Sequence, residues 1–370
     1  MSVADPDLAA AGEHHPRASV NLIGHAAAVS ALAEARPGGR LHHGWLICGP
    51  RGIGKATLAY RFARALLAGA PPADGGLFGD APVDDLSVDT ESAVFRQVLA
   101  GSHPDLLAIE RGFDPRRKRL RDEIVVDDVR EMGGFLALTP AMGGWRIVIV
   151  DAADEMNRNA ANAILKLLEE PPARALVVLV SHNPGRLLPT IRSRCRQLPL
   201  RPLAEAEVAG LLARLRPELD AAEQAALVSL AEGSIGRAIL LADAGGLELY
   251  RQMIDVLADA PRFDIARLYK LADDWARAPR NAAGDPFEIA TDLLLAWLAR
   301  VIRAAAGGGP APTLLAGEGE IAGRLLADRP LIEWVERHAD IAGMLRRGTA
   351  LNLDRRQMVL NIFDKLAAAR

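Results

Sequence analysis

The chain has 370 residues, more than one compact core usually holds, so we expect two or three domains. Half of the residues are hydrophobic and the net charge is −3, which excludes a contact with nucleic acid driven by the charge of the whole chain. No apolar stretch is long enough to span a bilayer and no apolar leader is present, so we expect a cytoplasmic protein without a membrane contact.

The first predicted elements are a helix, a strand and a second helix. Residues 1–20 are expected to form a loose arm, and the pattern over 22–35 predicts a helix. The short apolar run 44–48 predicts a buried strand. After residue 54, one helical face carries Ala59, Phe62, Ala63, Leu66 and Leu67. A glycine-rich loop joins this strand to this helix, which is the arrangement that a phosphate-binding P-loop requires.

That loop, residues 49–56, matches the P-loop pattern except at its last position. Glycines allow backbone N–H groups to turn inward around a polyphosphate, and a lysine reaches the terminal oxygens. The position that normally offers a hydroxyl to Mg²⁺ is Ala56, and Thr57 comes one residue late, about 100° around the helix. The candidate nucleotide-binding residues of this segment are Gly49, Gly52, Gly54, Lys55 and Thr57.

A less regular region follows the P-loop helix. Residues 69–90 are rich in Gly, Pro, Ala and Asp and predict an exposed loop or insertion. The segment 106–109 predicts a strand, and 125–138 predicts a helix. Between them, the basic run 116–121 suggests a DNA contact. Because acidic residues flank this run and no aromatic residue interleaves it, a solvated hairpin loop is favoured.

A second nucleotide motif follows on the strand predicted over 146–151. This strand ends in Asp151, where the carboxylate that organises magnesium belongs. An ATPase places a water-activating Glu directly after it, whereas this chain has Ala152. Asp154 and Glu155 lie beyond the strand end, so their register is wrong for that role. The sequence therefore predicts a site that binds ATP or ADP weakly and does not hydrolyse it.

The rest of the chain completes an α/β domain and then becomes helical. A helix is predicted over 160–168, a strand over 175–180, and a short segment over 197–200. Apolar strands that alternate with helices predict a parallel, doubly wound sheet. Beyond residue 202 the patterns are helical, over 205–214, 221–231, 236–244 and the last hundred residues. We expect three domains, namely an α/β domain over 1–202, a small helical domain over 203–245 and a helical domain over 246–370.

Two motifs resemble a known family. Residues 162–172 read Asn-Ala-Ile-Leu-Lys-Leu-Leu-Glu-Glu-Pro-Pro and residues 192–195 read Arg-Ser-Arg-Cys, which together resemble the clamp-loader branch of the AAA+ proteins. The resemblance implies a P-loop AAA+ domain, a helical lid and a C-terminal collar that drives oligomerisation. It implies that Arg194 projects as an arginine finger into the ATP site of a neighbouring subunit. Asn183 stands where the family's first sensor lies, and Arg237 comes one place later than the lid arginine of active relatives.

The resemblance also implies partners. They are ATPase subunits of the gamma/tau type, a delta-type subunit and, through the complex, the sliding clamp and primed DNA. Many members of the family carry a four-cysteine zinc module. This chain has only two cysteines, Cys48 and Cys195, so we expect no zinc and no metal site.

Three alternatives stay open. By charge alone, Arg194 belongs to a solvated basic stretch with Arg192 and Arg196, whereas the preceding helix motif favours the finger. Asn183 either orients a water on a phosphate or caps the following loop. The chain is either a clamp-loader subunit that is not itself catalytic or an autonomous P-loop ATPase that acts on DNA. The two lost catalytic side chains disfavour the second.

Overall fold

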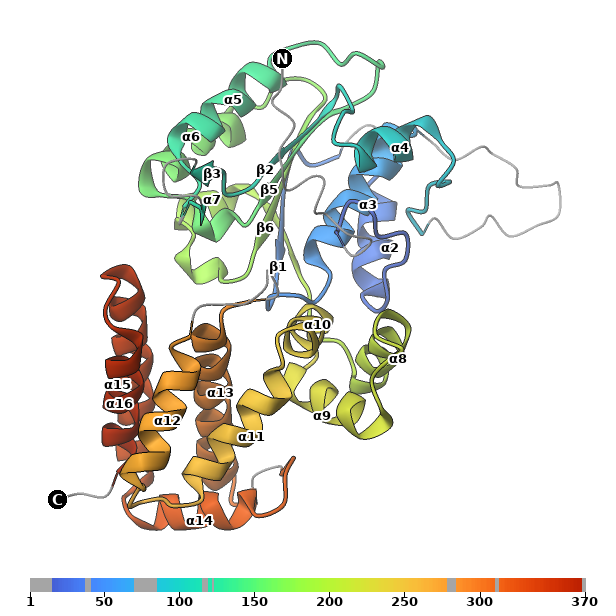
Figure 1. Ribbon diagram of the computed structural model, residues 1–370. Coiled ribbons are helices and arrows are strands. Elements are labelled where there is room, and N and C mark those ends of the chain that lie inside the picture. Colours follow the sequence, from blue (N-terminus) through green and yellow to red (C-terminus); the bar gives the residue numbers. More distant parts are fainter. Residues whose placement is uncertain are drawn as a thin grey trace. The chain divides into compact units, whose positions relative to one another are not determined.

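The computed structural model describes residues 15–36, 41–69, 85–114, 119–121, 123–277, 284–309 and 313–367 (Figure 1). The chain divides into two compact units, residues 1–207 and 208–370, and each is described by itself. The boundaries that the sequence predicts at 202 and 245 stay predictions.

Unit 1 is built on a parallel sheet of five strands. The strands are β1 (Gly44–Cys48), β2 (Leu106–Ile109), β5 (Arg146–Asp151), β6 (Ala175–Ser181) and β7 (Arg196–Pro199). Their order in space is β2-β5-β6-β1-β7, and every pairing between them is parallel. The sheet confirms the expected α/β class, and the short segment near 197–200 forms its edge strand.

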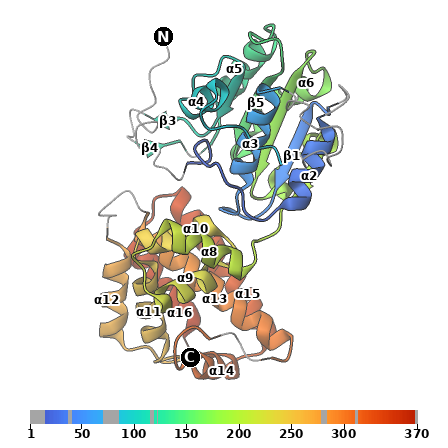
Figure 2. The ribbon, with the colours of Figure 1, turned by 90° about the vertical axis from the view of Figure 1, so that its right-hand side faces the viewer.

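Helices cover both faces of this sheet, so the central strands β1, β5 and β6 are buried along nearly their whole length, whereas the edge strand β7 is mostly exposed. One face packs against α2 (Ala26–Ala35), α3 (Lys55–Leu67) and α4 (Ala93–Leu99). The other face packs against α5 (Val126–Leu136), α6 (Arg158–Glu169) and α7 (Pro189–Arg194). In β1, Trp45 belongs to the first core and Leu46 to the second. Figure 1 shows the two helix layers, and Figure 2 views the side with α2 and α3.

The segment before α2 differs from the loose arm that the sequence predicts. Arg64 of α3 is a buried guanidinium, with only 2% of the residue exposed. It donates hydrogen bonds to the carbonyls of Arg17 at 2.7 Å and Ser19 at 2.8 Å. A buried guanidinium requires such acceptors, so these carbonyls hold the segment against α3. The expectation of a loose arm is therefore wrong for residues 15–20, and residues 1–14 lie outside the described part of the chain.

Part of the basic run 116–121 lies in a strand pair, as the predicted hairpin requires. Strands β3 (Phe113–Asp114) and β4 (Arg119–Leu120) pair in an antiparallel ladder. Residues 115–118 between them, and most of the 69–90 segment, lie outside the described residues. The hairpin is confirmed, while solvation of the basic run stays a prediction.

Unit 2 is helical, and α8 (Glu205–Leu215) begins just before it. The following helices are α9 (Ala221–Ala231), α10 (Ile235–Asp243), α11 (Gly246–Leu257), α12 (Ile265–Trp275), α13 (Pro286–Ala306), α14 (Glu318–Ala327), α15 (Leu331–Ala350) and α16 (Arg355–Leu366). Within 208–277, 284–309 and 313–367 the chain forms no strand, as the sequence predicts.

The core of unit 2 forms where α13 meets α11 and α15, and where α16 meets α12 and α15. Its largest fully buried side chains include Trp275, Trp297 and Trp334. Glu318 is also buried, and its carboxylate accepts hydrogen bonds from the Tyr250 hydroxyl at 3.0 Å and from the backbone N–H groups of Leu314 and Leu315, just before α14. Burial raises the pKa of Tyr250 far above its usual value, so this hydroxyl remains a donor.

Candidate functional site

The P-loop lies at the carboxyl end of β1 and leads directly into α3. Gly49, Gly52 and Gly54 all have positive φ angles, of 149°, 72° and 99°. Side-chain-bearing residues rarely adopt such angles, which explains the glycines. A Cβ on Gly49 would also lie 2.6 Å from the carbonyl oxygen of Leu200, so the loop and the end of β7 approach each other closely.

Lys55, the first residue of α3, is buried in this loop. Only 3% of the residue is exposed, and its ammonium donates a hydrogen bond to the carbonyl of Pro50. Burial lowers the pKa of Lys55 to about 8, although the nearby Asp151 acts in the opposite direction. Burial likewise raises the pKa of Asp151 to about 7, and the charge of Glu110 adds to this rise. The ammonium and the carboxylate thus share a poorly hydrated site.

The two catalytic positions are alanines in the expected places. Ala56 follows Lys55 in the first turn of α3, and β5 ends at Asp151, directly before Ala152. Asp154 lies in the short 3₁₀ turn Ala153–Glu155 beyond the strand. Its carboxylate accepts hydrogen bonds from the backbone N–H groups of His182 at 2.8 Å and Asn183 at 3.0 Å. Asp154 therefore joins the ends of β5 and β6 and has a structural contact of its own.

Glu155 pairs with two arginines in this arrangement. Its carboxylate lies 2.9 Å from the guanidinium of Arg51 and 2.8 Å from that of Arg111. Both oxygens of this carboxylate are therefore engaged in ion pairs within the chain. The sequence interpretation did not identify Arg111, because only the order of strands in the sheet brings β2 next to β5.

Of the two roles that the sequence allows for Asn183, the structure shows the capping contact. Its side-chain oxygen accepts a hydrogen bond from the N–H of Gly185 at 3.2 Å, at the start of the 3₁₀ turn Pro184–Arg186. The neighbouring His182 was not selected from the sequence. Burial lowers the pKa of His182 to about 4, and the positive charges of Lys55 and Arg51 act in the same direction. His182 is therefore a neutral member of the site at pH 7.

Arg194 is the last residue of α7 and lies on the surface of unit 1. About 36% of its side chain is exposed. One terminal nitrogen lies 2.8 Å from a carboxylate oxygen of Glu169, at the end of α6, and the other donates to the carbonyl of Thr190 at 3.1 Å. The structure thus separates Arg194 from the P-loop residues, which gather at the opposite, carboxyl end of β1.

The lid arginine that the sequence singles out forms an ion pair within unit 2, and the two cysteines are buried. Arg237 of α10 pairs with Asp292 of α13 at 2.9 Å, within unit 2. Cys48 and Cys195 are both buried as free thiols. The described residues contain no group of three or more His, Cys, Asp or Glu side chains that could hold a metal ion. Within the same residues, every helix is too short or too polar to cross a bilayer.

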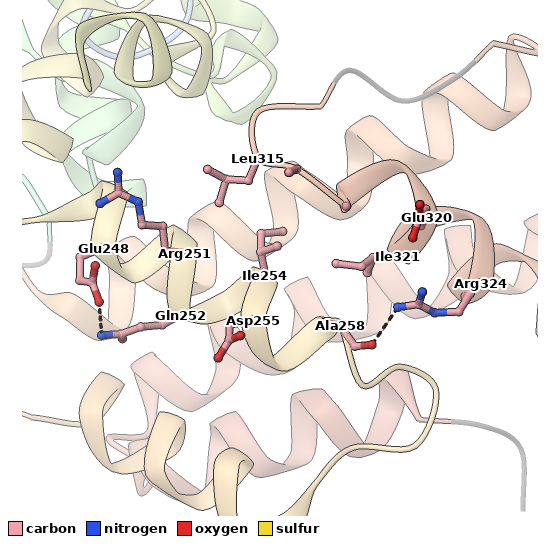
Figure 3. Close-up of a pocket in the computed structure, with 12 residues that line it drawn as sticks. Glu248, Arg251, Gln252, Ile254, Asp255, Ala258, Leu315, Glu320, Ile321 and Arg324 are labelled. Atoms are coloured by element: carbon pink, nitrogen blue, oxygen red, sulfur yellow. Dashed lines mark hydrogen bonds between the residues drawn. The ribbon is translucent and has the colours of Figure 1, made fainter. Parts of the chain in front are cut away.

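A cavity of about 650 Å³ opens between α11 and α14 in unit 2 (Figure 3). Its lining includes the apolar side chains of Ile254 and Ile321. Carboxylates of Glu248, Asp255 and Glu320 line it together with the guanidinium groups of Arg251 and Arg324. The cavity is thus lined by charges of both signs.

Comparison with known proteins finds relatives among replication proteins. Residues 24–204 match the family described as DNA polymerase III, delta subunit. The chain is 36% identical over 244 residues to DNA polymerase III subunit delta' of Pseudomonas aeruginosa, covering 65% of this chain and 69% of that protein. It is 30% identical over 234 residues to subunit tau/gamma of Haemophilus influenzae, covering 62% of this chain but only 31% of that longer protein. A gamma subunit-related protein from Thermotoga maritima covers 91% of the chain and is itself covered to 98%, at 18% identity and a TM-score of 0.37.

Proposed function

The chain belongs to the family of DNA polymerase III delta' subunits, and from that premise we propose that it is a clamp-loader subunit that does not hydrolyse ATP itself. In this proposal it occupies one place in a ring with gamma/tau-type and delta-type subunits. It supplies Arg194 to the ATP held by a neighbouring ATPase subunit and so helps to load the sliding clamp onto primed DNA. Because replication takes place in the bacterial cytoplasm, that is the proposed compartment.

One observation carries this proposal. The guanidinium of Arg194 lies on the surface, outside the chain's own nucleotide site, while that site has only methyl groups at Ala56 and Ala152, where a hydroxyl and a carboxylate would be needed. An arginine is suited to act on a neighbour's nucleotide because it keeps its charge and presents a rigid planar set of donors. Arginine fingers stabilise the charge that grows on a transferred phosphoryl group. A chain with a finger and no hydrolytic groups fits a subunit that assists another subunit's reaction.

The same site supports weak binding of ATP or ADP. Backbone N–H groups of the P-loop and the ammonium of Lys55 remain as phosphate ligands, but Lys55 is bonded to Pro50 and would have to leave that carbonyl. Asp151 is the one carboxylate at the position that organises magnesium, and Ala56 offers no hydroxyl beside it. These residues therefore fit a nucleotide held by its phosphates better than a hydrolysing magnesium complex.

The test is hydrolysis by the reconstituted complex. The chain is mixed with the gamma/tau-type and delta-type subunits, and ATP turnover is measured with clamp and primed DNA. Arg194→Ala should leave assembly intact and lower turnover, and Arg194→Lys should fail nearly as badly because an ammonium lacks the planar fork. An isolated finger is worth about 10³–10⁵ in rate, and a ring with other intact sites should lose less. Arg192→Ala is the matched control. An equal loss of ATP turnover in both variants would mean that Arg194 acts only as part of a basic surface and not as a finger.

A further inference from the structure

The two family motifs meet at one place in unit 1, where α6 and α7 end beside the start of β1. Gly44, the first residue of β1, lies between them. A Cβ on Gly44 would be 3.1 Å from the Leu168 side chain and 3.3 Å from the carbonyl oxygen of Arg194. His43 also donates a hydrogen bond to the carbonyl of Leu168 at 3.0 Å. This close packing fixes the backbones that carry Glu169 and Arg194 relative to each other.

Glu169 forms an ion pair with Arg194, the arginine that the proposed function assigns to the ATP of a neighbouring subunit. We propose that Glu169 is a positioning residue for Arg194, a role that rests on the proposed function. The Glu169 carboxylate holds one terminal nitrogen of the guanidinium at 2.8 Å, and the carbonyl of Thr190 holds the other at 3.1 Å. Both acceptors lie on this chain, so they fix the plane of the fork while N–H groups remain for a phosphoryl oxygen.

The energetic effect of this pair falls on catalysis and not on folding. The side chains of Arg194 and Glu169 are 36% and 47% exposed, so water screens their attraction and the pair contributes little to the stability of unit 1. A long arginine side chain has many rotamers, however, and a finger must hold one geometry when the phosphoryl group transfers. Loss of Glu169 therefore leaves a folded chain whose arginine adopts the productive geometry less often.

The experiment is a double-mutant cycle in the reconstituted complex. Glu169→Ala should lower the kcat of ATP hydrolysis by the neighbouring subunit about five- to tenfold while leaving its KM for ATP unchanged, since the finger acts in the transition state. Glu169→Gln keeps an acceptor of the same length and should restore part of the rate. In an Arg194→Ala background, Glu169→Ala should have no further effect, because the residue acts only through that arginine.

Glu170→Ala is the matched control, because Glu170 is the next residue, carries the same charge and is exposed. It should leave kcat unchanged. A rate that is unchanged or raised by Glu169→Ala, while Arg194→Ala lowers it, would overturn the positioning role and leave the proposed function standing. An equal loss from Glu169→Ala with and without Arg194 would also overturn it. Unchanged hydrolysis with Arg194→Ala would overturn the proposed function itself.

Discussion

The ammonium of Lys55 donates a hydrogen bond to the carbonyl of Pro50, inside the same loop that would surround a phosphate. The lysine is thus satisfied by its own loop and is almost completely buried. A nucleotide must replace this contact before it can gain from the lysine. Together with the alanines at positions 56 and 152, this contact supports the proposal that the chain does not hydrolyse ATP itself.

The isolated chain is accordingly expected to show no steady ATP hydrolysis. Neither a hydroxyl at Ala56 nor a carboxylate at Ala152 is available, and Glu155 faces two arginines. Phosphate release by the purified chain, measured with and without magnesium, tests this expectation. Lys55→Ala serves as the control, and turnover that disappears in this variant would show that the site is active.

A second prediction concerns the C-terminal helices and assembly. Val359, Ile362, Phe363 and Leu366 of α16 are buried inside unit 2, whereas Leu351 and Leu353 before it are 68% and 50% exposed. If this end of the unit forms the proposed collar, the double change Leu351→Ser and Leu353→Ser should weaken assembly by about tenfold or more, because each exposed leucine buried at an interface contributes roughly 1–2 kcal/mol.

Sedimentation of the mixed subunits measures that loss. Leu138→Ser is the matched control, since Leu138 is 61% exposed but belongs to unit 1. Assembly that survives the double change and falls with the control would place the interface elsewhere.

The buried carboxylate of Asp105 should be among the most sensitive positions for stability. It accepts hydrogen bonds from the N–H groups of Ala141 and Met142 at 2.8 and 2.9 Å, and it lies 3.5 Å from the guanidinium of Arg146. Asp105→Ala leaves that buried guanidinium without its carboxylate, so we expect a loss of about 3 kcal/mol in unit 1. Hydrogen exchange of the β5 amides under native conditions reports this loss.

The control for Asp105 is Asp127→Ala. Asp127 pairs with Arg130 at 2.9 Å, but both side chains are more than 70% exposed. Such a pair is worth about 0–1 kcal/mol, so exchange should change little. Similar exchange in the two variants would mean that the Asp105 network does not hold the loop before β5.

Stability should also fall in mild acid because of His182. Its pKa is about 4 in the folded chain against an ordinary value of 6.5. Between these pH values the unfolded chain binds a proton at His182 that the folded chain does not. The contribution of His182 to the free energy of unfolding is therefore fully present above about pH 6.5 and is lost as the pH falls toward 4. His182→Gln should reduce this decrease, measured as the shift in urea midpoint between pH 7 and pH 5. An identical shift in the variant would assign the acid sensitivity to other groups.

Much of unit 1 could be predicted from the sequence, because its strands are short apolar runs with clear ends. The end of β5 at Asp151 follows from where the apolar run stops, and this alone places Ala152 in the catalytic position. The hydrogen bonds of Arg64 to residues 17 and 19 have no such signal, since they join a helix side chain to carbonyls of an irregular segment.

Contacts between elements could not be predicted from the sequence either. Arg194 and Glu169 each belong to a motif that the sequence reveals, but their pairing depends on how α6 and α7 pack beside Gly44. His182 and Arg111 come to the nucleotide site only through the order of strands in the sheet. Periodicity identifies elements and their buried faces, and it carries no information about which ends will meet.

The position of β1 also has a consequence for the order of events during synthesis. β1 leaves the ribosome first of the five strands, yet its two neighbours in the sheet, β6 and β7, are the last. Until residue 181 has emerged, this apolar strand has no permanent neighbour on either edge, and its second edge has none until residue 199. Such long-range pairing is slow and leaves an aggregation-prone edge uncovered. For most of the time in which unit 1 is translated, residues 44–48 therefore lack the strands that pair with them in the folded sheet.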